Sequence, residues 1–422
     1  MSQSHQLHAG QTLTGDSNKD YLLVAPLGQP NVWTAVDSET QSSVFIIKQP
    51  ASDDSAAASW PNFQQEMVMQ ELFKDDPAIR QKVDQIPPSK YGEPPRIVLE
   101  ILEGTVWDAR AKRPLSVREI KSIMRDTLEG LVCVHEKGLV YADLKMENIL
   151  VSGFNPLSED KDGDTLVTKL GDLGIVMPPT QGVVQPLTYR APEVYFKHSI
   201  TPAADIWSWG LLVCHLLEAR SNMPAPVLVS APANTHLAPP PSNAPPSLQT
   251  SNSTDSATSI SNPPTPSPNG TNFTDRGLYD DLYSGHGLRS QQEQSIRYAL
   301  ANDYDLTSIP YYADCTLPAR DREHPTGRQW HFLKEKGVQE DDVAFLKWVM
   351  DPDPTSRPTA QEVLESAWLK ESEKEVVKEK GDVETVKNEE EAETSKSHKR
   401  RLSTYLDYGV GAVRRAVGVE RG

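Results

Sequence analysis

Tyr141-Ala-Asp-Leu-Lys-Met-Glu-Asn-Ile-Leu150 is the most informative stretch of the chain. It follows residues 116–137, where apolar side chains recur at helical spacing and Ser116 with Glu119 forms the pattern of a capping box. Gly138 is well placed to end that helix. The stretch therefore places a carboxylate, an ammonium group and an amide together in a loop that directly follows a helix.

This loop resembles the catalytic loop of protein kinases, H-R-D-L-K-x-x-N. In that family the Asp orients the attacking hydroxyl and accepts its proton, the Lys neutralises the transferring phosphoryl group, and the Asn holds a magnesium ion. The resemblance implies these roles, in order, for Asp143, Lys145 and Asn148. A lone motif of this length is weak evidence, because charged loops are usually only solvated, so the neighbouring motifs decide the matter.

Downstream, Leu170-Gly-Asp-Leu-Gly174 resembles the D-F-G element, which implies that Asp172 binds the magnesium ion. Tyr189-Arg-Ala-Pro-Glu193 resembles the A-P-E element, and Asp205-Ile-Trp-Ser-Trp-Gly210 resembles the helix F signature. In the family, that last Asp ties down the catalytic loop. Arg357 matches a late arginine that forms a buried ion pair with the A-P-E glutamate, here Glu193. The resemblance therefore implies structural roles for Glu193, Asp205 and Arg357.

Upstream, Phe45-Ile-Ile-Lys48 lies where the family has V-A-I-K, which implies that Lys48 reaches the α- and β-phosphates of ATP. We expect Glu66 to be its partner on the following helix, with Glu71 as the alternative.

The strand 98–102 is similar to the gatekeeper and hinge of the family, with Leu99 as gatekeeper. The backbone groups of Glu100 and Leu102 would then pair with the adenine edge, and Leu150 would lie beneath the ring. Gly28 is the one glycine retained in the glycine-rich loop.

The order of these elements implies an α+β, bilobal protein kinase fold, with a small β-rich N-lobe and a larger helical C-lobe. Strand patterns at 21–24, 32–36 and 44–48 and a helical pattern over 56–80 fit the N-lobe. Residues 221–275 are rich in Pro, Ser and Thr, and residues 370–397 alternate Glu and Lys. The predicted organisation is a disordered terminus 1–18, a kinase domain 19–369 (N-lobe 19–103, C-lobe 104–369) with a disordered insertion 221–275, and a charged, largely disordered tail 370–422.

The amino-acid composition indicates the cellular location and the kinds of partner to expect. The 42 Lys and Arg residues against 59 Asp and Glu give a net charge of −17, which disfavours nucleic acid as a partner. Three scattered cysteines indicate reduced thiols in an intracellular compartment, and no apolar run is long enough to span a membrane. We expect a cytoplasmic location, with a nuclear alternative resting on the basic run 399–401. Protein substrates with Ser or Thr and a regulatory partner at the insertion or tail are the expected partners.

Several positions depart from the family pattern. Pro30 offers no backbone donor in the poor glycine-rich loop, Ile46 narrows the roof of the adenine pocket, and Gln70 replaces an apolar residue between the lobes. The sequence thus supports a Mg-ATP-dependent serine/threonine protein kinase, with a pseudokinase scaffold as the alternative. All six charged or amide groups of the catalytic machinery are nevertheless present, which favours the enzyme: Lys48, Glu66, Asp143, Lys145, Asn148 and Asp172.

Overall fold

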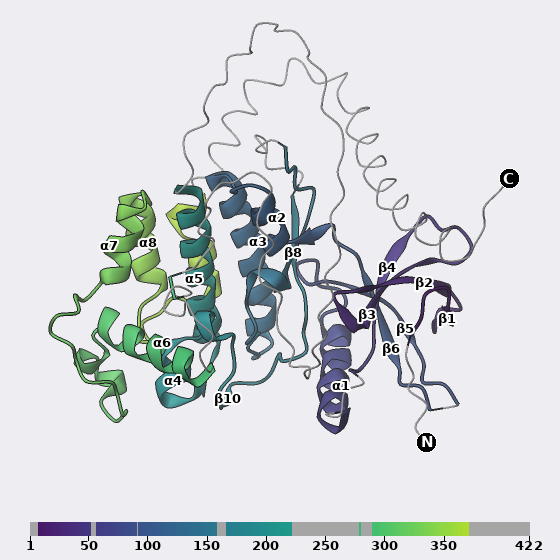
Figure 1. Cartoon of the computed structure of the whole chain (residues 1–422), viewed down its shortest axis with the longest axis horizontal. Helices are drawn as coiled ribbons and strands as arrows, with labels where there is room; N and C mark the ends of the chain where they lie inside the picture. The colour runs from purple at the N-terminus through teal and green to yellow at the C-terminus, as the bar shows by residue number, and fades with distance from the viewer. Residues whose placement is uncertain are drawn as a thin grey trace, which may run out of the picture.

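The computed structural model describes residues 7–51, 56–90, 92–157, 166–221, 278–279 and 289–370. Figure 1 shows two unequal parts, a curled β-sheet with one helix and a larger, mostly helical body. The predicted two-lobed α+β fold is therefore confirmed. The predicted insertion 221–275 and tail 370–422 lie outside the described residues, apart from Ser221 and Lys370 at their edges.

The N-lobe contains an antiparallel sheet with the strand order β1-β2-β3-β4-β6-β5. Its strands are β1 (Thr12–Thr14), β2 (Asp20–Leu27), β3 (Gln29–Asp37), β4 (Val44–Lys48), β5 (Lys82–Ile86) and β6 (Arg96–Glu100).

The alternation of side chains along β4 positions the first site residue. Phe45 and Ile47 pack into the cluster on one face of the sheet, whereas Ile46 packs on the other face. Since successive side chains of a strand point to opposite faces, Lys48 shares the face of Ile46. Helix α1 (Ala56–Leu72) packs against that face, because its Phe63 joins the same cluster as Ile46.

The predicted disorder of residues 1–18 is wrong for residues 7–18. Strand β1 pairs with β2, with Leu13 opposite Tyr21. Leu7 and Leu13 are both buried and belong to the outer cluster of the sheet. Two isolated apolar side chains in a polar segment thus cover the sheet edge, and the folded N-lobe begins well before residue 19. The helix predicted over 56–80 also ends earlier, at Leu72, and strand β5 follows it.

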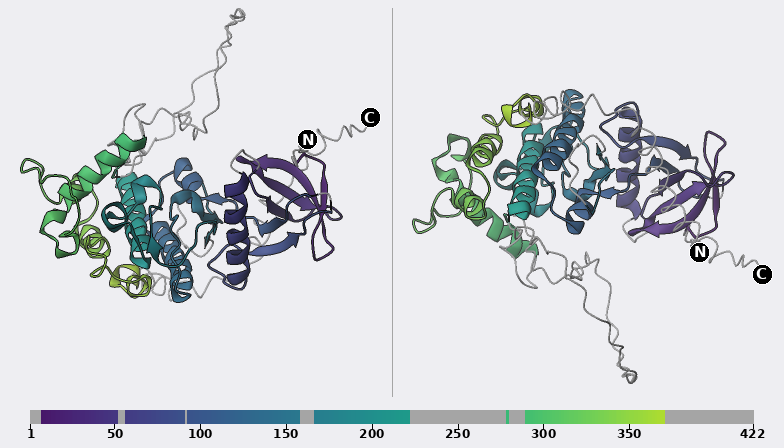
Figure 2. Two further views of the ribbon diagram at one scale, coloured as in Figure 1. Left: turned by 90° about the horizontal axis from the view of Figure 1, so that it is seen from below. Right: turned by 90° about the horizontal axis from the view of Figure 1, so that it is seen from above.

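Helix α1 stands between the sheet and the helical body in both views of Figure 2. Its residue Met69 and the following Phe73 belong to the large cluster of the C-lobe. The helix that carries Glu66 is therefore held by both lobes.

The C-lobe is built around two long helices, α3 (Val117–Glu136) and α5 (Pro202–Ser221), which lie side by side. The predicted capping box of α3 is present, since the Ser116 side chain accepts from the Glu119 amide and the Glu119 side chain accepts from the Ser116 amide. Trp207 and Trp209 of α5 are fully buried. The other helices are α2 (Val106–Lys112), α4 (Pro192–Lys197), α6 (Arg289–Asp303), α7 (Arg328–Glu335), α8 (Glu340–Val349) and α9 (Ala360–Leu364).

Short strands line the junction between the lobes and the outer edge of the C-lobe. They are β7 (Gly104–Thr105), β8 (Ile149–Ser152), β9 (Val167–Leu170), β10 (Thr180–Gln181) and β11 (Ser199–Ile200). Short 3₁₀ turns complete the lobe: η1 (Met146–Asn148), η2 (Leu187–Tyr189), η4 (Leu306–Ser308) and η5 (Pro310–Tyr312).

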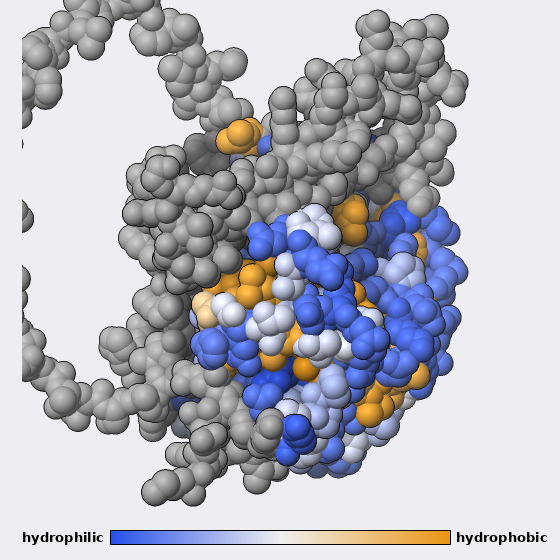
Figure 3. Space-filling model, turned by 90° about the vertical axis from the view of Figure 1, so that its right-hand side faces the viewer, coloured by the Kyte–Doolittle hydropathy of each residue, from blue (hydrophilic) through white to orange (hydrophobic). Residues whose placement is uncertain are grey.

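Within the described ranges, none of the helices is long and apolar enough to cross a membrane. Viewed from the sheet end, the described surface is largely hydrophilic with small, scattered hydrophobic patches (Figure 3).

Candidate active site

The loop between α3 and β8 gathers three polar side chains around one carboxylate. Asp143 Oδ2 accepts hydrogen bonds from Lys145 Nζ at 2.9 Å and from Asn148 Nδ2 at 2.7 Å. Asn148 Nδ2 also donates to the Asp143 carbonyl at 2.8 Å, so the turn η1 is closed on itself. Burial raises the pKa of Asp143 above its ordinary value, although Lys145 and Asn148 oppose this effect.

A buried carboxylate at the start of α5 holds this loop in place. Asp205 accepts hydrogen bonds from the backbone amides of Tyr141 (2.8 Å) and Ala142 (2.9 Å), and His135 Nε2 lies 2.9 Å from it. Ala142 has a φ of 64°, a left-handed conformation that is costly for a residue with a side chain. The Asp205 contacts fix that strained backbone, and so fix the direction of Asp143.

Lys48 lies between two carboxylates. Its Nζ is 2.7 Å from Glu66 Oε1 and 3.3 Å from Asp172 Oδ1. Glu71, the alternative partner, pairs instead with Lys74 and Lys82. Burial would lower the pKa of Lys48, but the two carboxylates outweigh burial and raise it. Lys48 is therefore held in its charged form.

Hydrogen bonds through Gly171 and Asn148 link the Lys48, Glu66 and Asp172 side chains to the loop that carries Asp143. The Gly171 amide, next to Asp172, donates to the Asn148 carbonyl at 2.8 Å, and the Asn148 side chain contacts Asp143. Asp143 and Asp172, twenty-nine positions apart by their numbers, thus lie close enough for the charge of Asp172 to raise the pKa of Asp143, and Asp172 contacts Lys48. We call the region around these three side chains the cleft.

The oxygen atoms of this cleft suit a hard divalent cation. The Asp172 side chain is 46% exposed, and its Oδ1 is engaged by Lys48 and the Gly174 amide. In the described part of the chain Asp172 Oδ2 accepts no hydrogen bond, and the Asn148 bonds to Asp143 use its nitrogen, leaving its side-chain oxygen. Mg²⁺ prefers one or two such oxygens together with phosphate oxygens. Among described residues no group of three or more His, Cys, Asp or Glu side chains could hold a metal ion.

The opposite end of the cleft is apolar. Ile46 and Leu99 lie opposite each other on β4 and β6, and both are buried. Leu150 of β8 lies beside Gly171, where an added Cβ would come within 3.0 Å of Leu150 Cδ1. The chain then runs from Glu100, the last residue of β6, to Leu102. We call the set of residues that the family resemblance assigns to the adenine base, Ile46, Leu99, Leu150 and residues 100–102, the base subsite.

Gly28 lies at the tip of an unusually tight hairpin. It has a φ of 71° and joins β2 directly to β3, with Leu27 paired opposite Gln29. Pro30 follows, and its carbonyl accepts a hydrogen bond from Trp33 Nε1 at 2.9 Å. Because proline has no backbone N–H, position 30 offers no donor to a phosphate at this tip.

The structure places two cationic side chains next to the base subsite that the sequence did not predict. Arg80 Nε donates to the Glu100 carbonyl at 3.0 Å, and Lys169 Nζ donates to Glu100 Oε1 at 2.6 Å. Burial lowers the pKa of Arg80 to about 10, although Glu100, Glu66 and Asp172 oppose this effect. The sequence signal was weak, because an arginine beyond a helix and a lysine in a short strand are both typical of solvated positions.

Glu193 and Arg357 form a fully buried ion pair. Arg357 donates two hydrogen bonds to the Glu193 carboxylate, at 2.7 and 3.1 Å, and both side chains are at most 1% exposed. This pair connects α4 to the segment between α8 and α9.

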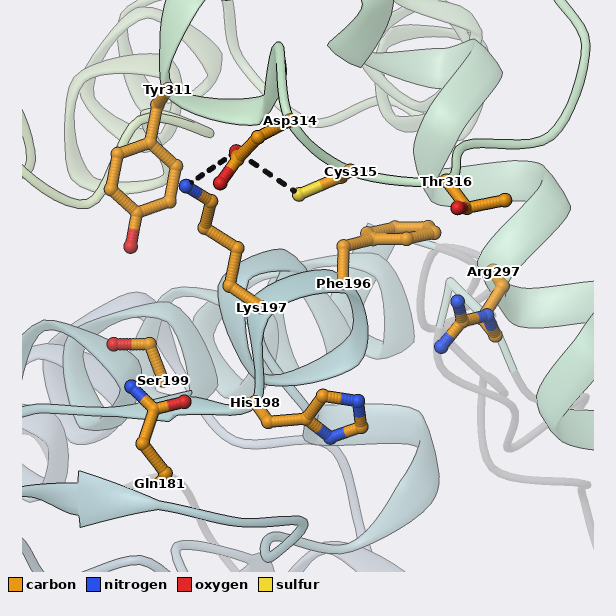
Figure 4. Close-up of a pocket in the computed structure, with 10 residues that line it drawn as sticks. All are labelled: Gln181, Phe196, Lys197, His198, Ser199, Arg297, Tyr311, Asp314, Cys315 and Thr316. Carbon is orange, nitrogen blue, oxygen red and sulfur yellow. Dashed lines mark hydrogen bonds and ion pairs between the residues drawn. The ribbon is translucent and has the colours of Figure 1, made fainter.

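A separate polar hollow of about 630 Å³ lies on the C-lobe beside α4 and α6 (Figure 4). Lys197 points toward Tyr311 and Asp314, and its Nζ is 2.7 Å from Asp314. Arg297 donates to the Tyr195 carbonyl and lies over the Phe196 ring. The two cations thus have partners within the chain, and the hollow is distinct from the cleft of Asp143.

Comparisons with known proteins agree with this geometry. A family model described as the protein kinase domain matches residues 28–369. The serine/threonine-protein kinase PknL of Mycobacterium tuberculosis is 33% identical over 141 residues, which is 31% of this chain and 33% of the relative. The serine/threonine-protein kinase STE20 of Kluyveromyces lactis is 27% identical over 215 residues, 49% of this chain and 20% of the relative. Cyclin-dependent kinase F-3 of Oryza sativa is 33% identical over 135 residues, 30% of this chain and 28% of the relative. The chain thus matches at most a third of the length of these relatives.

Proposed function

We propose that this chain, which belongs to the protein kinase family, transfers the γ-phosphoryl group of Mg-ATP to serine or threonine hydroxyls of proteins. The observation that carries the proposal is the meeting of Lys48, Asp143 and Asp172 in one cleft, with Glu66, Lys145 and Asn148 in contact with them. The names of the relatives and the presence of Lys145 support the serine/threonine class.

In the proposed reaction, the Asp143 carboxylate orients the hydroxyl and takes up its proton as the oxygen attacks the γ-phosphorus. The new P–O bond forms while the bond from that phosphorus to the bridging oxygen breaks, and ADP leaves with the electron pair. Lys145 neutralises charge on the transferring group. Lys48, oriented by Glu66, binds the α- and β-phosphates.

Asp172 and Asn148 are the residues that would hold magnesium. A magnesium ion held there would offset the negative charge of the phosphates. The Asp172 carboxylate has one oxygen committed to Lys48 and Gly174, so the other is available to a cation without breaking those contacts.

The alternative is a pseudokinase, and the hairpin at Gly28 is the observation that favours it. Each lost charge-assisted amide contact to a phosphate costs about 1.5–3 kcal/mol. Such a loss weakens nucleotide binding but removes no catalytic group.

Phosphoryl transfer from γ-labelled nucleotide to a protein or peptide substrate tests the proposal. The purified chain is expected to incorporate label, and Asp143→Asn to lose at least about a hundredfold in rate. Both proteins should show the same thermal unfolding midpoint, because the amide keeps the size of the side chain. Equal background labelling by both would instead favour the scaffold.

We propose a cytoplasmic location and a regulatory partner that binds the segment 221–275 or the tail 370–422. Their composition supports this, since polar segments of low hydrophobicity commonly serve as binding regions.

A further inference from the structure

The hinge carbonyl that would serve an adenine base already accepts one hydrogen bond, which leaves it a single lone pair. Glu100 lies directly after Leu99 at the end of β6, and its carbonyl accepts the Arg80 Nε–H at 3.0 Å. The Glu100 amide is also engaged, because it donates to the Gln81 carbonyl at 3.0 Å. A base that approaches residues 100–102 therefore meets a guanidinium group where an acceptor was expected.

Arg80 is held firmly in this position. Its backbone amide donates to the Leu170 carbonyl of β9 at 2.8 Å, and Ile79 forms a bridge with Leu170. The guanidinium also experiences the charges of Glu100, Glu66 and Asp172, which line the cleft. Withdrawal of Arg80 would break the Nε bond and move the cation away from these three carboxylates.

The guanidinium retains donors for a ligand. The Arg80 side chain is only partly buried. Its one side-chain hydrogen bond to a described residue uses Nε. Nη1 and Nη2 contribute further N–H groups in a fixed planar arrangement. Lys169 does not compete for this role, because Glu100 Oε1 engages it at 2.6 Å.

The two purines differ at the edge that would face these donors. Adenine carries an amino group at position 6, so its N–H donors would oppose the guanidinium donors. Guanine carries a carbonyl there, and its O6 and N7 are both acceptors that arginine binds in a bidentate manner. A site that presents donors therefore matches guanine better than adenine, whose amino group would find only the second lone pair of the Glu100 carbonyl.

We propose that Arg80 makes the base subsite accept guanine, so that GTP is a phosphoryl donor that competes with ATP in this chain. The inference rests on the proposed function for the transfer step, whereas base recognition can be measured without any transfer. Discrimination by one bidentate arginine pair corresponds to roughly 5- to 150-fold in affinity.

Binding to the full chain is the direct test. Calorimetry with Mg-GTP and Mg-ATP should give a GTP affinity equal to or greater than that of ATP. Arg80→Leu removes the donors at similar volume and frees the Glu100 carbonyl. That variant should bind GTP at least about tenfold more weakly and should bind ATP at least as well as the natural chain.

Lys74→Leu is the matched control, because it removes an exposed cation at the end of α1 whose partner is Glu71. It should leave both affinities unchanged. A thermal unfolding curve for each variant, without nucleotide, shows whether the protein is folded.

The outcomes separate this inference from the proposed function. If the natural chain binds ATP more tightly than GTP, the role of Arg80 is overturned. Label transfer from ATP would in that case leave the kinase proposal intact. GTP binding that survives Arg80→Leu also overturns it. GTP binding without label transfer from either nucleotide supports the base preference and overturns the kinase proposal. If neither nucleotide binds to any folded variant, both are overturned.

Discussion

Asp126 is a partly buried carboxyl group on α3, outside the cleft. Burial, and secondarily the charge of Glu129, raises its pKa from the ordinary 3.8 to about 7. The folded state therefore holds a proton that the unfolded chain has released between about pH 4 and pH 7. Over that window the free energy of unfolding falls as pH rises, by less than ~1.4 kcal/mol per pH unit because the group is partly solvated.

Asp126→Asn should remove this pH dependence. Urea unfolding at pH 5 and pH 8 should show a variant whose advantage over the natural chain is larger at pH 8 and constant above it. A difference in stability that does not change between the two pH values would contradict the raised pKa of Asp126.

Some residues of the cleft could be predicted from the sequence and others could not. Asp143, Lys145 and Asn148 could be placed together because one short loop carries them. Arg80 could not, because its contact with Glu100 depends on how a loop after α1 meets the end of β6. Leu7 and Leu13 were missed for a similar reason, since their burial is determined by a sheet edge formed by distant residues.

Helix α1 contains a buried amide without a partner. The Gln70 side chain is almost fully buried, and within the described ranges neither of its polar atoms has a hydrogen bond. Gln70→Met keeps the volume and removes two unsatisfied groups, each worth about 1–3 kcal/mol. Chemical unfolding should show a more stable variant.

Gln65 of the same helix provides the control for Gln70. Its Nε2 donates to the Val176 carbonyl at 3.1 Å, so Gln65→Met should lower stability by about 0.5–1.5 kcal/mol. If Gln70→Met were as destabilising as Gln65→Met, the Gln70 amide would have a partner.

The ion pair of Glu193 and Arg357 connects α4 to the segment after α8. Arg357→Leu leaves the Glu193 charge buried and unpaired, so we expect a loss of about 3–5 kcal/mol. The double variant Glu193→Gln with Arg357→Leu should lose less, because no buried charge remains. Lys334→Leu, which breaks an exposed pair with Glu340, should have no measurable effect on urea unfolding.

Helices and strands could be predicted from the sequence where a local signal marks them. The capping box before α3 and the strand pattern of β4 are local signals, and these elements were predicted. Strand β5 was not, because its Lys82-Val-Asp-Gln-Ile86 is too polar to be distinguished from a loop without its neighbour β6.

The two halves of the chain on either side of 222–277 share one hydrophobic cluster. Leu212 of α5, Ile296 of α6 and Leu346 of α8 belong to it. We expect limited proteolysis to cut first within 222–277, where Pro, Ser and Thr predominate, and the two fragments to elute together in gel filtration. Separate elution, or a first cut inside α3, would contradict one folded domain with an insertion.

The backbone contacts between residues 78–80 and β9 have a mechanical consequence. The Leu170 amide donates to the Ala78 carbonyl, and the Arg80 amide donates to the Leu170 carbonyl. These two hydrogen bonds connect a loop of the small lobe to strand β9 of the large lobe. If the two lobes move apart, the sheet must therefore rotate about the contacts between residues 78–80 and β9, which lie to one side of the cleft. The tip at Gly28 would then move farther than the residues beside Leu170, so the end of the cleft nearest that tip would open first.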